Sequence, residues 1–187
     1  MRHARLTCLA LLLLVPEGVG CRLRAGEAPY VENAAQAREQ ELEKRLRRHP
    51  DDDDALRELG HLRWMYLGKT REAVQILEPL ASKGDPAAQF AMVVIAHGHV
   101  DLEAVWRNGT ALLTTAASGG DDPRSDLARA LAEPTARFLD DIHESRPDAD
   151  PQFVAFFSRI AADALPVEAA QILSSLRARI ARRNGED

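Results

Sequence analysis

The sequence has little cysteine, little glycine and proline, and no excess of basic residues. Two cysteines in 187 residues are too few for a framework of disulfides. The 11 glycines and 10 prolines are too few for a collagen-like or low-complexity chain. A net charge of −5 at pH 7 lacks the basic footprint of nucleic-acid-binding proteins, so we expect no nucleic-acid partner. What remains is a folded protein whose length suits one domain.

Residues that favour β-strands are also scarce. Alanine and leucine together number 55, whereas valine, isoleucine and threonine together number 22. Small and straight-chain residues favour helices, and β-branched residues favour strands. The composition therefore predicts an all-α fold.

The first 21 residues differ from the rest of the chain. A basic start with two arginines is followed by an apolar run over residues 6–15, and small residues at 18–20 directly precede Cys21. This order of segments is typical of a secretory signal peptide. The apolar run is too short to cross a bilayer, which needs about 20 residues. We therefore predict that residues 1–20 are a signal peptide.

The end of this segment resembles the lipobox of bacterial lipoproteins. Val19, Gly20 and Cys21 fit the last three positions of that motif, and Gly18 stands where leucine is usual. In that family the cysteine is lipidated and becomes the first residue of the mature protein. The resemblance implies that Cys21 carries the lipid anchor and that residues 21–33 form a tether. The alternative is an ordinary secreted protein with a free cysteine.

The positions of the cysteines favour the lipoprotein interpretation. Cys8 lies within the predicted signal peptide, and residues 22–187 contain no cysteine. A domain without free thiols avoids intermolecular disulfides in an oxidising compartment. Arg22 stands where inner-membrane lipoproteins carry aspartate, so the resemblance implies an outer-membrane lipoprotein that faces the periplasm.

Apolar residues recur with a helical period along most of the remaining chain. The first periodic segment, 34–48, has a thin apolar stripe, which is typical of a helix that packs on one side only. A proline at position 134 predicts a kink or a break near Glu133. The pattern predicts helices over residues 34–48, 55–67, 71–82, 87–97, 101–117, 124–145, 151–164 and from 166 onward.

Four aspartates at positions 51–54 separate the first two predicted helices. Aspartate is favoured at the N-cap and in the first turn of a helix, where it accepts backbone N–H bonds and opposes the helix dipole. A calcium site needs ligands spread along a loop with a turn glycine, and that pattern is missing here. We therefore interpret the run as a helix cap and expect no metal site.

The turns between the predicted helices recur at a regular interval. Pro50, Pro86 and Pro123 are 36 and 37 residues apart, and residues 81–86 are similar to residues 117–123. A period of 20–50 residues is typical of stacked supersecondary units. Two predicted helices per period indicate antiparallel helix pairs. We therefore predict a short α-solenoid in a helical-repeat domain, to which we assign all residues after the tether.

Short motifs within residues 50–123 recur at positions typical of one repeat family: Leu59-Gly60, Gly68, Glu72-Ala73 and Asp85-Pro86. On these residues the segment resembles tetratricopeptide repeats, including their Sel1-like branch. The resemblance implies a right-handed superhelix in which the first helix of each pair lines a concave, protein-binding surface.

Four residues on those first helices are candidates for binding a protein partner: Arg63, Trp64, Gln89 and His97. Trp64 is the strongest of them, because tryptophan and arginine dominate interface hot spots. The alternative is that Trp64 fills the core.

No catalytic motif is found. Gly68-Lys69-Thr70 lacks the glycine that a phosphate loop requires five positions earlier, where Arg63 stands. We expect no catalytic residues and no cofactor. We therefore predict a noncatalytic outer-membrane lipoprotein that acts as a protein-binding scaffold or assembly factor for an envelope machine, such as a pilus, secretion or motility complex. The alternative is an envelope metal-dependent enzyme, or an accessory to one, that uses His97 and His99.

Overall fold

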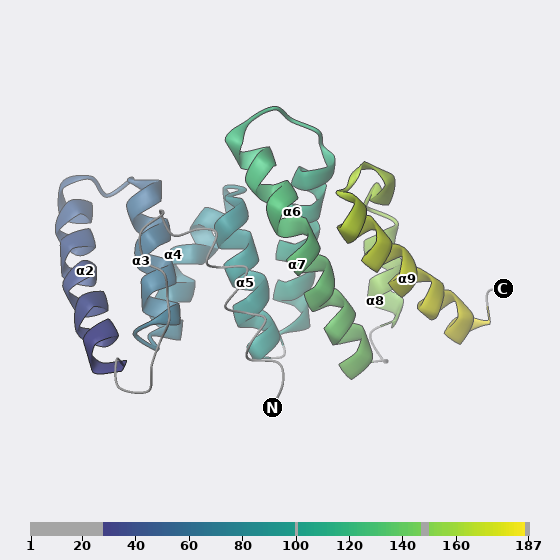
Figure 1. Cartoon of the computed structure of the whole chain (residues 1–187), viewed down its shortest axis with the longest axis horizontal. Helices are drawn as coiled ribbons and strands as arrows, with labels where there is room; N and C mark the ends of the chain where they lie inside the picture. Colours follow the sequence, from purple (N-terminus) through teal and green to yellow (C-terminus); the bar gives the residue numbers. More distant parts are fainter. Residues whose placement is uncertain (1–27, 100, 147–149, 186–187) are drawn as a thin grey trace.

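The structure consists of helices joined by short turns (Figure 1). The computed structural model describes residues 28–99, 101–146 and 150–185, and no strand occurs within these ranges, so the predicted all-α fold is confirmed. The predicted signal peptide, Cys21 and residues 22–27 lie outside the described residues. The helices are α2 (Ala28–Arg48), α3 (Asp53–Met65), α4 (Thr70–Ser82), α5 (Pro86–Gly98), α6 (Leu102–Ala117), α7 (Pro123–Ser145), α8 (Asp150–Phe157) and α9 (Val167–Asn184), with a 3₁₀ turn at Ala162–Ala164.

Consecutive helices pack against one another as neighbours (Figure 1). α3 packs on α4, α5 packs on both α4 and α6, and α7 packs on both α6 and α9. α5 also contacts α3 and α7, so four helices surround it, and every residue from Pro86 to Ala96 is buried. Among the described helices, none combines the length and the apolar character that a membrane span requires.

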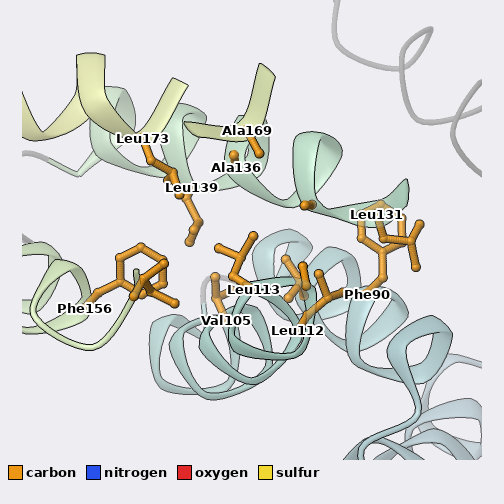
Figure 2. Packing of buried hydrophobic residues seen from close by; sticks show 14 of the residues in the cluster. Phe90, Val105, Leu112, Leu113, Leu131, Ala136, Leu139, Phe156, Ala169 and Leu173 are labelled. Atoms are coloured by element: carbon orange, nitrogen blue, oxygen red, sulfur yellow. The ribbon is translucent and has the colours of Figure 1, made fainter. Parts of the chain in front are cut away.

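Apolar side chains join the helices in three clusters. The largest lies among α5, α6, α7, α8 and α9, and Figure 2 shows Leu113 of α6 and Leu139 of α7 within it. A smaller cluster joins α4 to α5. The smallest consists of Leu42 of α2 with Ala55 and Leu59 of α3. α2 therefore rests on little fully buried apolar surface.

Aspartate caps explain where several helices begin. Asp52 lies in the run at 51–54, and its side chain accepts a hydrogen bond from the Ala55 nitrogen at 3.0 Å. The interpretation of that run as a helix cap is therefore confirmed. No group of three or more His, Cys, Asp or Glu side chains in the described ranges is arranged to hold a metal ion. The same kind of cap begins α5 at Asp85, α6 at Asp101 and α7 at Asp122.

The first helix is longer than the sequence predicted. The expected start was residue 34, whereas α2 begins at Ala28. Pro29, which we took as part of a tether, stands in the first turn, where a missing N–H group breaks no helical hydrogen bond. Only residues 22–27 therefore separate Cys21 from the helical domain.

Of the kink or break predicted near Glu133, the break does not occur, because α7 runs from Pro123 to Ser145 as one helix. Buried residues on both sides of the proline, among them Leu131 and Thr135, hold the helix against its neighbours. In addition, the Thr135 hydroxyl donates to the Leu131 carbonyl at 2.7 Å. In contrast, α8 is shorter than predicted and ends at Phe157.

Two buried glycines allow a matched test of the packing. A Cβ atom at Gly60 of α3 would lie 2.6 Å from Leu77 Cγ, whereas one at Gly109 of α6 would meet Thr135 Cγ2 at 3.7 Å. We expect Gly60→Ala to lower the free energy of unfolding by about 1–3 kcal/mol, because the methyl group overpacks the α3–α4 contact. We expect Gly109→Ala to raise it by about 0.5–1 kcal/mol, because alanine is the better helix former. Urea unfolding measures both changes, and equal effects would contradict this description of the packing.

Candidate protein-binding site

The four predicted binding residues lie in different environments. Arg63 and Trp64 are near the end of α3, Gln89 is near the start of α5 and His97 is near the end of α5. Gln89 is only 2% exposed, and its side-chain nitrogen donates to the Ala81 carbonyl at 3.1 Å. It therefore ties α5 to the end of α4 and lines no exposed surface, which corrects the sequence prediction. The reason is that α5 is surrounded by other helices, so its polar side chains turn toward them.

Arg63 is held in an ion-pair network between α3 and α2. Its guanidinium group lies 2.7 Å from Glu39 and 2.7 Å from Glu43. The Lys69 ammonium group also contacts Glu39, at 2.7 Å. Arg63 thus fastens α2 to α3, and most of its side chain is unavailable to a partner.

Glu39 is the buried centre of this network. The residue is 7% exposed, and burial by itself acts to raise the pKa of its carboxyl group. The hydrogen bonds from Lys69 and Arg63 outweigh that effect and leave the pKa below its ordinary value of 4.5. Glu39 is therefore a carboxylate at neutral pH, and its charge is matched by two cations.

Trp64 and His97 each keep part of their surface open to solvent. Trp64 packs against both the cluster between α4 and α5 and the largest cluster, so it closes the seam between them. The His97 ring meets the Phe138 ring of α7 edge to face, with centroids 5.5 Å apart. Both side chains thus have a packing role as well as a partly exposed face, and their predicted role in binding stays a prediction.

Two exposed apolar residues next to Trp64 were not among the sequence-based candidates. Met65 is 37% exposed and Tyr66 is 41% exposed. The sequence predicts a helix that continues to residue 67, but α3 ends at Met65. Once the chain leaves the helix, the 3.6-residue period no longer decides which way a side chain faces.

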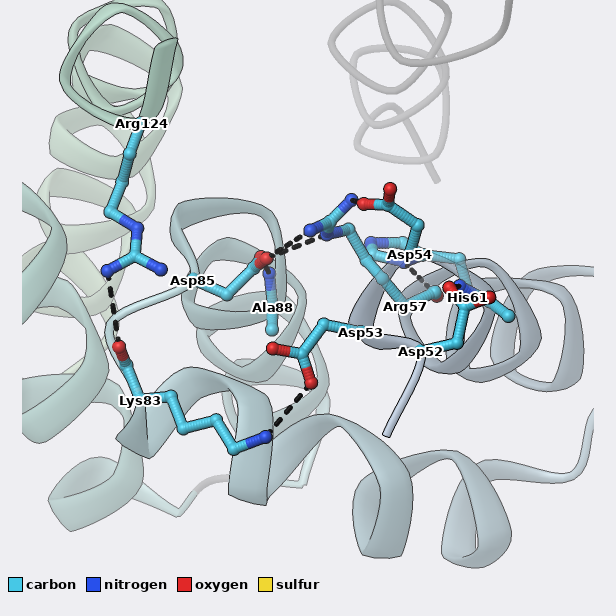
Figure 3. Close-up of polar contacts among 10 residues, drawn as sticks. Asp52, Asp53, Asp54, Arg57, His61, Lys83, Asp85, Ala88 and Arg124 are labelled. Carbon is cyan, nitrogen blue, oxygen red and sulfur yellow. Dashed lines mark hydrogen bonds and ion pairs between the residues drawn. The ribbon is translucent and has the colours of Figure 1, made fainter. Parts of the chain in front are cut away.

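Polar contacts join the starts of α3, α5 and α7 to one another and to the end of α4 (Figure 3). Arg57 of α3 donates to Asp85 at 2.7 Å and to Asp54 at 2.9 Å. Lys83, just after α4, contacts Asp53 at 2.9 Å. Its carbonyl oxygen accepts a hydrogen bond from Arg124 of α7 at 3.4 Å. These contacts fix the starts of α3, α5 and α7 relative to one another and to the end of α4.

His61 lies on α3 next to these contacts, one helical turn after Arg57. Its Nδ1 atom is 2.8 Å from the Arg57 carbonyl oxygen, and its Nε2 atom is buried. Burial lowers the pKa of His61 below its ordinary value of 6.5, although the neighbouring carbonyl and Asp85 act against it. The ring is therefore neutral at physiological pH.

The residues considered for a metal site are not brought together with a third ligand. His97 packs on Phe138, and His99 is exposed just beyond the end of α5. Beside the end of α2, an open hollow of about 400 Å³ is lined by Glu41, Lys44, Arg45, Arg48 and His49. Its charged, solvent-exposed walls are unlike the mostly apolar lining of small-molecule sites.

Comparison of the chain with protein-family models, with curated proteins and with solved structures yields no match. The function must therefore be argued from the residues themselves.

The ion-pair network predicts how α2 responds to substitution. We expect Glu39→Gln to lower the free energy of unfolding by about 1–2 kcal/mol, because Arg63 and Lys69 lose their charged partner. Glu41 is exposed and pairs with Arg38, so Glu41→Gln is the matched control and should cost less than about 0.5 kcal/mol. Urea unfolding at neutral pH compares the two. If Glu41→Gln lowered the free energy of unfolding as much as Glu39→Gln, the result would contradict the central role given to Glu39 in the network.

The same network predicts an acid dependence. Since the pKa of Glu39 is lowered on folding, its contribution to stability is present above about pH 4.5 and disappears as the pH falls through the folded-state value. Between about pH 6 and about pH 3.5, the wild-type protein should therefore lose more stability than the Glu39→Gln variant. An equal loss of unfolding free energy in the two proteins over this pH range would contradict the prediction.

His61 predicts a separate dependence at milder pH. Because its pKa is lowered on folding, the unfolded chain takes up a proton first, and stability falls as the pH drops below about 6.5. We expect the loss of stability between about pH 7.5 and about pH 5.5 to be smaller in His61→Gln than in the wild type. His49→Gln, at an exposed position, is the control and should behave as the wild type does. Urea midpoints at the two pH values give the measurement.

Proposed function

We propose that this protein is a noncatalytic lipoprotein of the bacterial outer membrane, anchored through Cys21 and facing the periplasm. The observation that carries the proposal is the cysteine that directly follows a signal-like segment, in a chain with no cysteine after it. The early start of α2 supports it, because six residues between Cys21 and a folded helix form a short tether. A single thiol at the end of such a tether is well placed to carry lipid.

We further infer that the helices form a short, right-handed tetratricopeptide-like solenoid. The support is that alternate helices are linked: α3 to α5 by Arg57 and Asp85, and α4 to α6 by Arg107 and Glu78 at 3.0 Å. Such links between alternate helices are expected when helix pairs stack in register. The recurring aspartate caps at the starts of α3, α5 and α7 agree with a repeat.

The proposed role of this solenoid is to bind another envelope protein, as a scaffold or assembly factor for a pilus, secretion or motility complex. Helix stacks of this kind present extended surfaces rather than enclosed pockets. The partly exposed faces of Trp64 and His97, at the ends of α3 and α5, are the proposed contact points. We do not retain Arg63 and Gln89 as contacts, because they are engaged within the fold.

The lipid anchor is tested by metabolic labelling. We expect the full chain, expressed in a Gram-negative host, to incorporate labelled palmitate and to fractionate with outer membranes. Cys21→Ser should abolish both, because no other cysteine follows the signal-like segment. Cys8→Ser should retain the label, since that residue would leave with the signal peptide. An unlabelled wild-type protein would overturn the proposal.

The partner is sought by crosslinking in intact envelopes. The anchored wild-type protein is crosslinked, purified and analysed by mass spectrometry, with the Cys21→Ser form as the control for contacts that depend on the membrane. The proposal expects one envelope protein with crosslinks near the ends of α3 and α5. Crosslinks confined to α8 and α9 would contradict the proposed contact points.

A further inference from the structure

The helix ends form two opposite edges of the molecule (Figure 1), and the residues on these edges differ in chemistry. The pairing of α2 with α3 is antiparallel, since Arg45 near the end of α2 contacts Asp52 before α3, whereas Glu39 contacts Lys69 after α3. The start of α2 thus lies on the same side as the α3–α4 turn. We call this side the tether edge, and it also contains the α5–α6 turn. The aspartate edge, on the opposite side, contains the α2–α3, α4–α5 and α6–α7 turns.

The length of the tether constrains which edge can approach a membrane. If Cys21 carries lipid, as proposed above, residues 22–27 separate the bilayer surface from Ala28. Six residues reach at most about 20 Å when fully extended. The start of α2 must then stay near the bilayer, and the tether edge is the side of the molecule that lies closest to the lipid.

The tether edge suits a lipid surface. Met65 and Tyr66 are exposed apolar residues of its α3–α4 turn. Two cations follow them, Lys69, which also pairs with Glu39, and Arg71, before the first acid of α4, Glu72. Tyrosine is enriched where proteins meet the headgroup region, and cations are attracted to anionic lipids. The neighbouring α5–α6 turn and the first turn of α6 contribute His99 and two acids, Asp101, which caps α6, and Glu103.

The aspartate edge is suited to face away from the membrane. Its turns and the first helical residues after them carry seven aspartates, four of which pair with the cations Arg45, Arg57 and Lys83. Arg48 and Arg124 are further cations of this edge. An anionic membrane surface repels carboxylates that lie within the Debye length, which is about 8 Å at physiological ionic strength. The aspartates are Asp51, Asp52, Asp53, Asp54, Asp85, Asp121 and Asp122.

We propose that the α3–α4 turn is a membrane-docking surface, and that Met65 and Tyr66 enter the headgroup region of the bilayer that carries the anchor. Two partly exposed side chains bind a bilayer only weakly by themselves. The tether compensates for this, because it raises the effective concentration of the turn at the surface to the millimolar range, about what a short linker provides. Docking fixes the orientation of the solenoid and turns the aspartate edge toward the periplasm. Trp64 and His97, near the ends of α3 and α5, then lie on the membrane side, so the partner proposed above is one that itself lies in or at the membrane.

The experiment replaces the cellular lipid by a chemical one. The mature chain from residue 21 has a single cysteine, which is coupled to a maleimide lipid in vesicles of phosphatidylethanolamine and phosphatidylglycerol. Backbone hydrogen exchange is compared with that of the same protein, blocked with N-ethylmaleimide and mixed with the same vesicles. We expect exchange at residues 65–69 to be slowed about threefold or more by tethering, with residues 49–52 and 118–122 unchanged.

A pair of double variants separates docking from general crowding at the surface. Met65→Ser with Tyr66→Ser should abolish the protection, because it removes the apolar contacts. Val154→Ser with Val167→Ser, at positions 49% and 64% exposed on α8 and α9, is the matched control and should retain it. Circular dichroism checks that both variants are folded.

Three results would overturn the docking proposal: no protection in the tethered wild type, protection of the aspartate edge instead, or protection that survives Met65→Ser with Tyr66→Ser. Because the coupling is chemical, these results do not depend on lipidation in cells. Failure of the palmitate labelling would overturn the anchor, whereas loss of protection on vesicles would overturn only the docking surface.

Discussion

The helix α5 is apolar on every side, and such a helix is stable in water only when other helices surround it. α3 and α4 cover one side of it, and α6 and α7 cover the other. The buried polar side chains at its start are hydrogen-bonded, except for the side-chain oxygen of Gln89. The Asp85 carboxylate accepts hydrogen bonds from the Ala88 backbone nitrogen and the Arg57 guanidinium group, and the Gln89 side-chain nitrogen donates to the Ala81 carbonyl. Burying these groups without partners would be costly, so the position of α5 fixes that of its neighbours.

The terminal helix α2 is held in place differently from α5. A stack of helices needs terminal helices whose outer faces are polar, or it would go on binding further helices. α2 meets this need with a face that includes Gln40, Glu41 and Lys44, all exposed. It is held by the small cluster around Leu42 and by the carboxylate of Glu39. The helix that would lead to the lipid anchor is thus attached largely through ion pairs.

The distribution of side chains over the two edges connects the fold to the proposed function. The helix caps require aspartate at the starts of α3, α5 and α7, and these starts all lie on one edge. Most of the capping carboxylates therefore gather there for reasons of helix stability, whereas the tether edge carries one such cap, Asp101, and the exposed apolar residues Met65 and Tyr66. On the proposed anchor, a charge pattern that arises from capping also orients the molecule at a membrane.

Much of the fold was predictable from the sequence because its causes are local. The cap at Asp52 and the turns at Gly68 and Gly84, both with positive φ, depend on a few consecutive residues. The helical period depends on little more, and most predicted helix ends lie within a few residues of the observed ones. The candidate site was predicted less well. Arg63 and Gln89 have suitable side chains for binding, but their partners come from other helices.

The sequence by itself determined the all-α class, the starts of helices α3 to α9 to within a few residues and the absence of cysteine after Cys21. Only the tertiary structure decided that Gln89 is buried, that Arg63 pairs with Glu39, and that Met65 and Tyr66 lie on the side of the molecule where α2 begins. The reason is physical: capping and periodicity act between residues a few positions apart. Burial and ion pairing depend on which helix, distant in sequence, covers each face, and a local pattern of residues does not predict which helix that is.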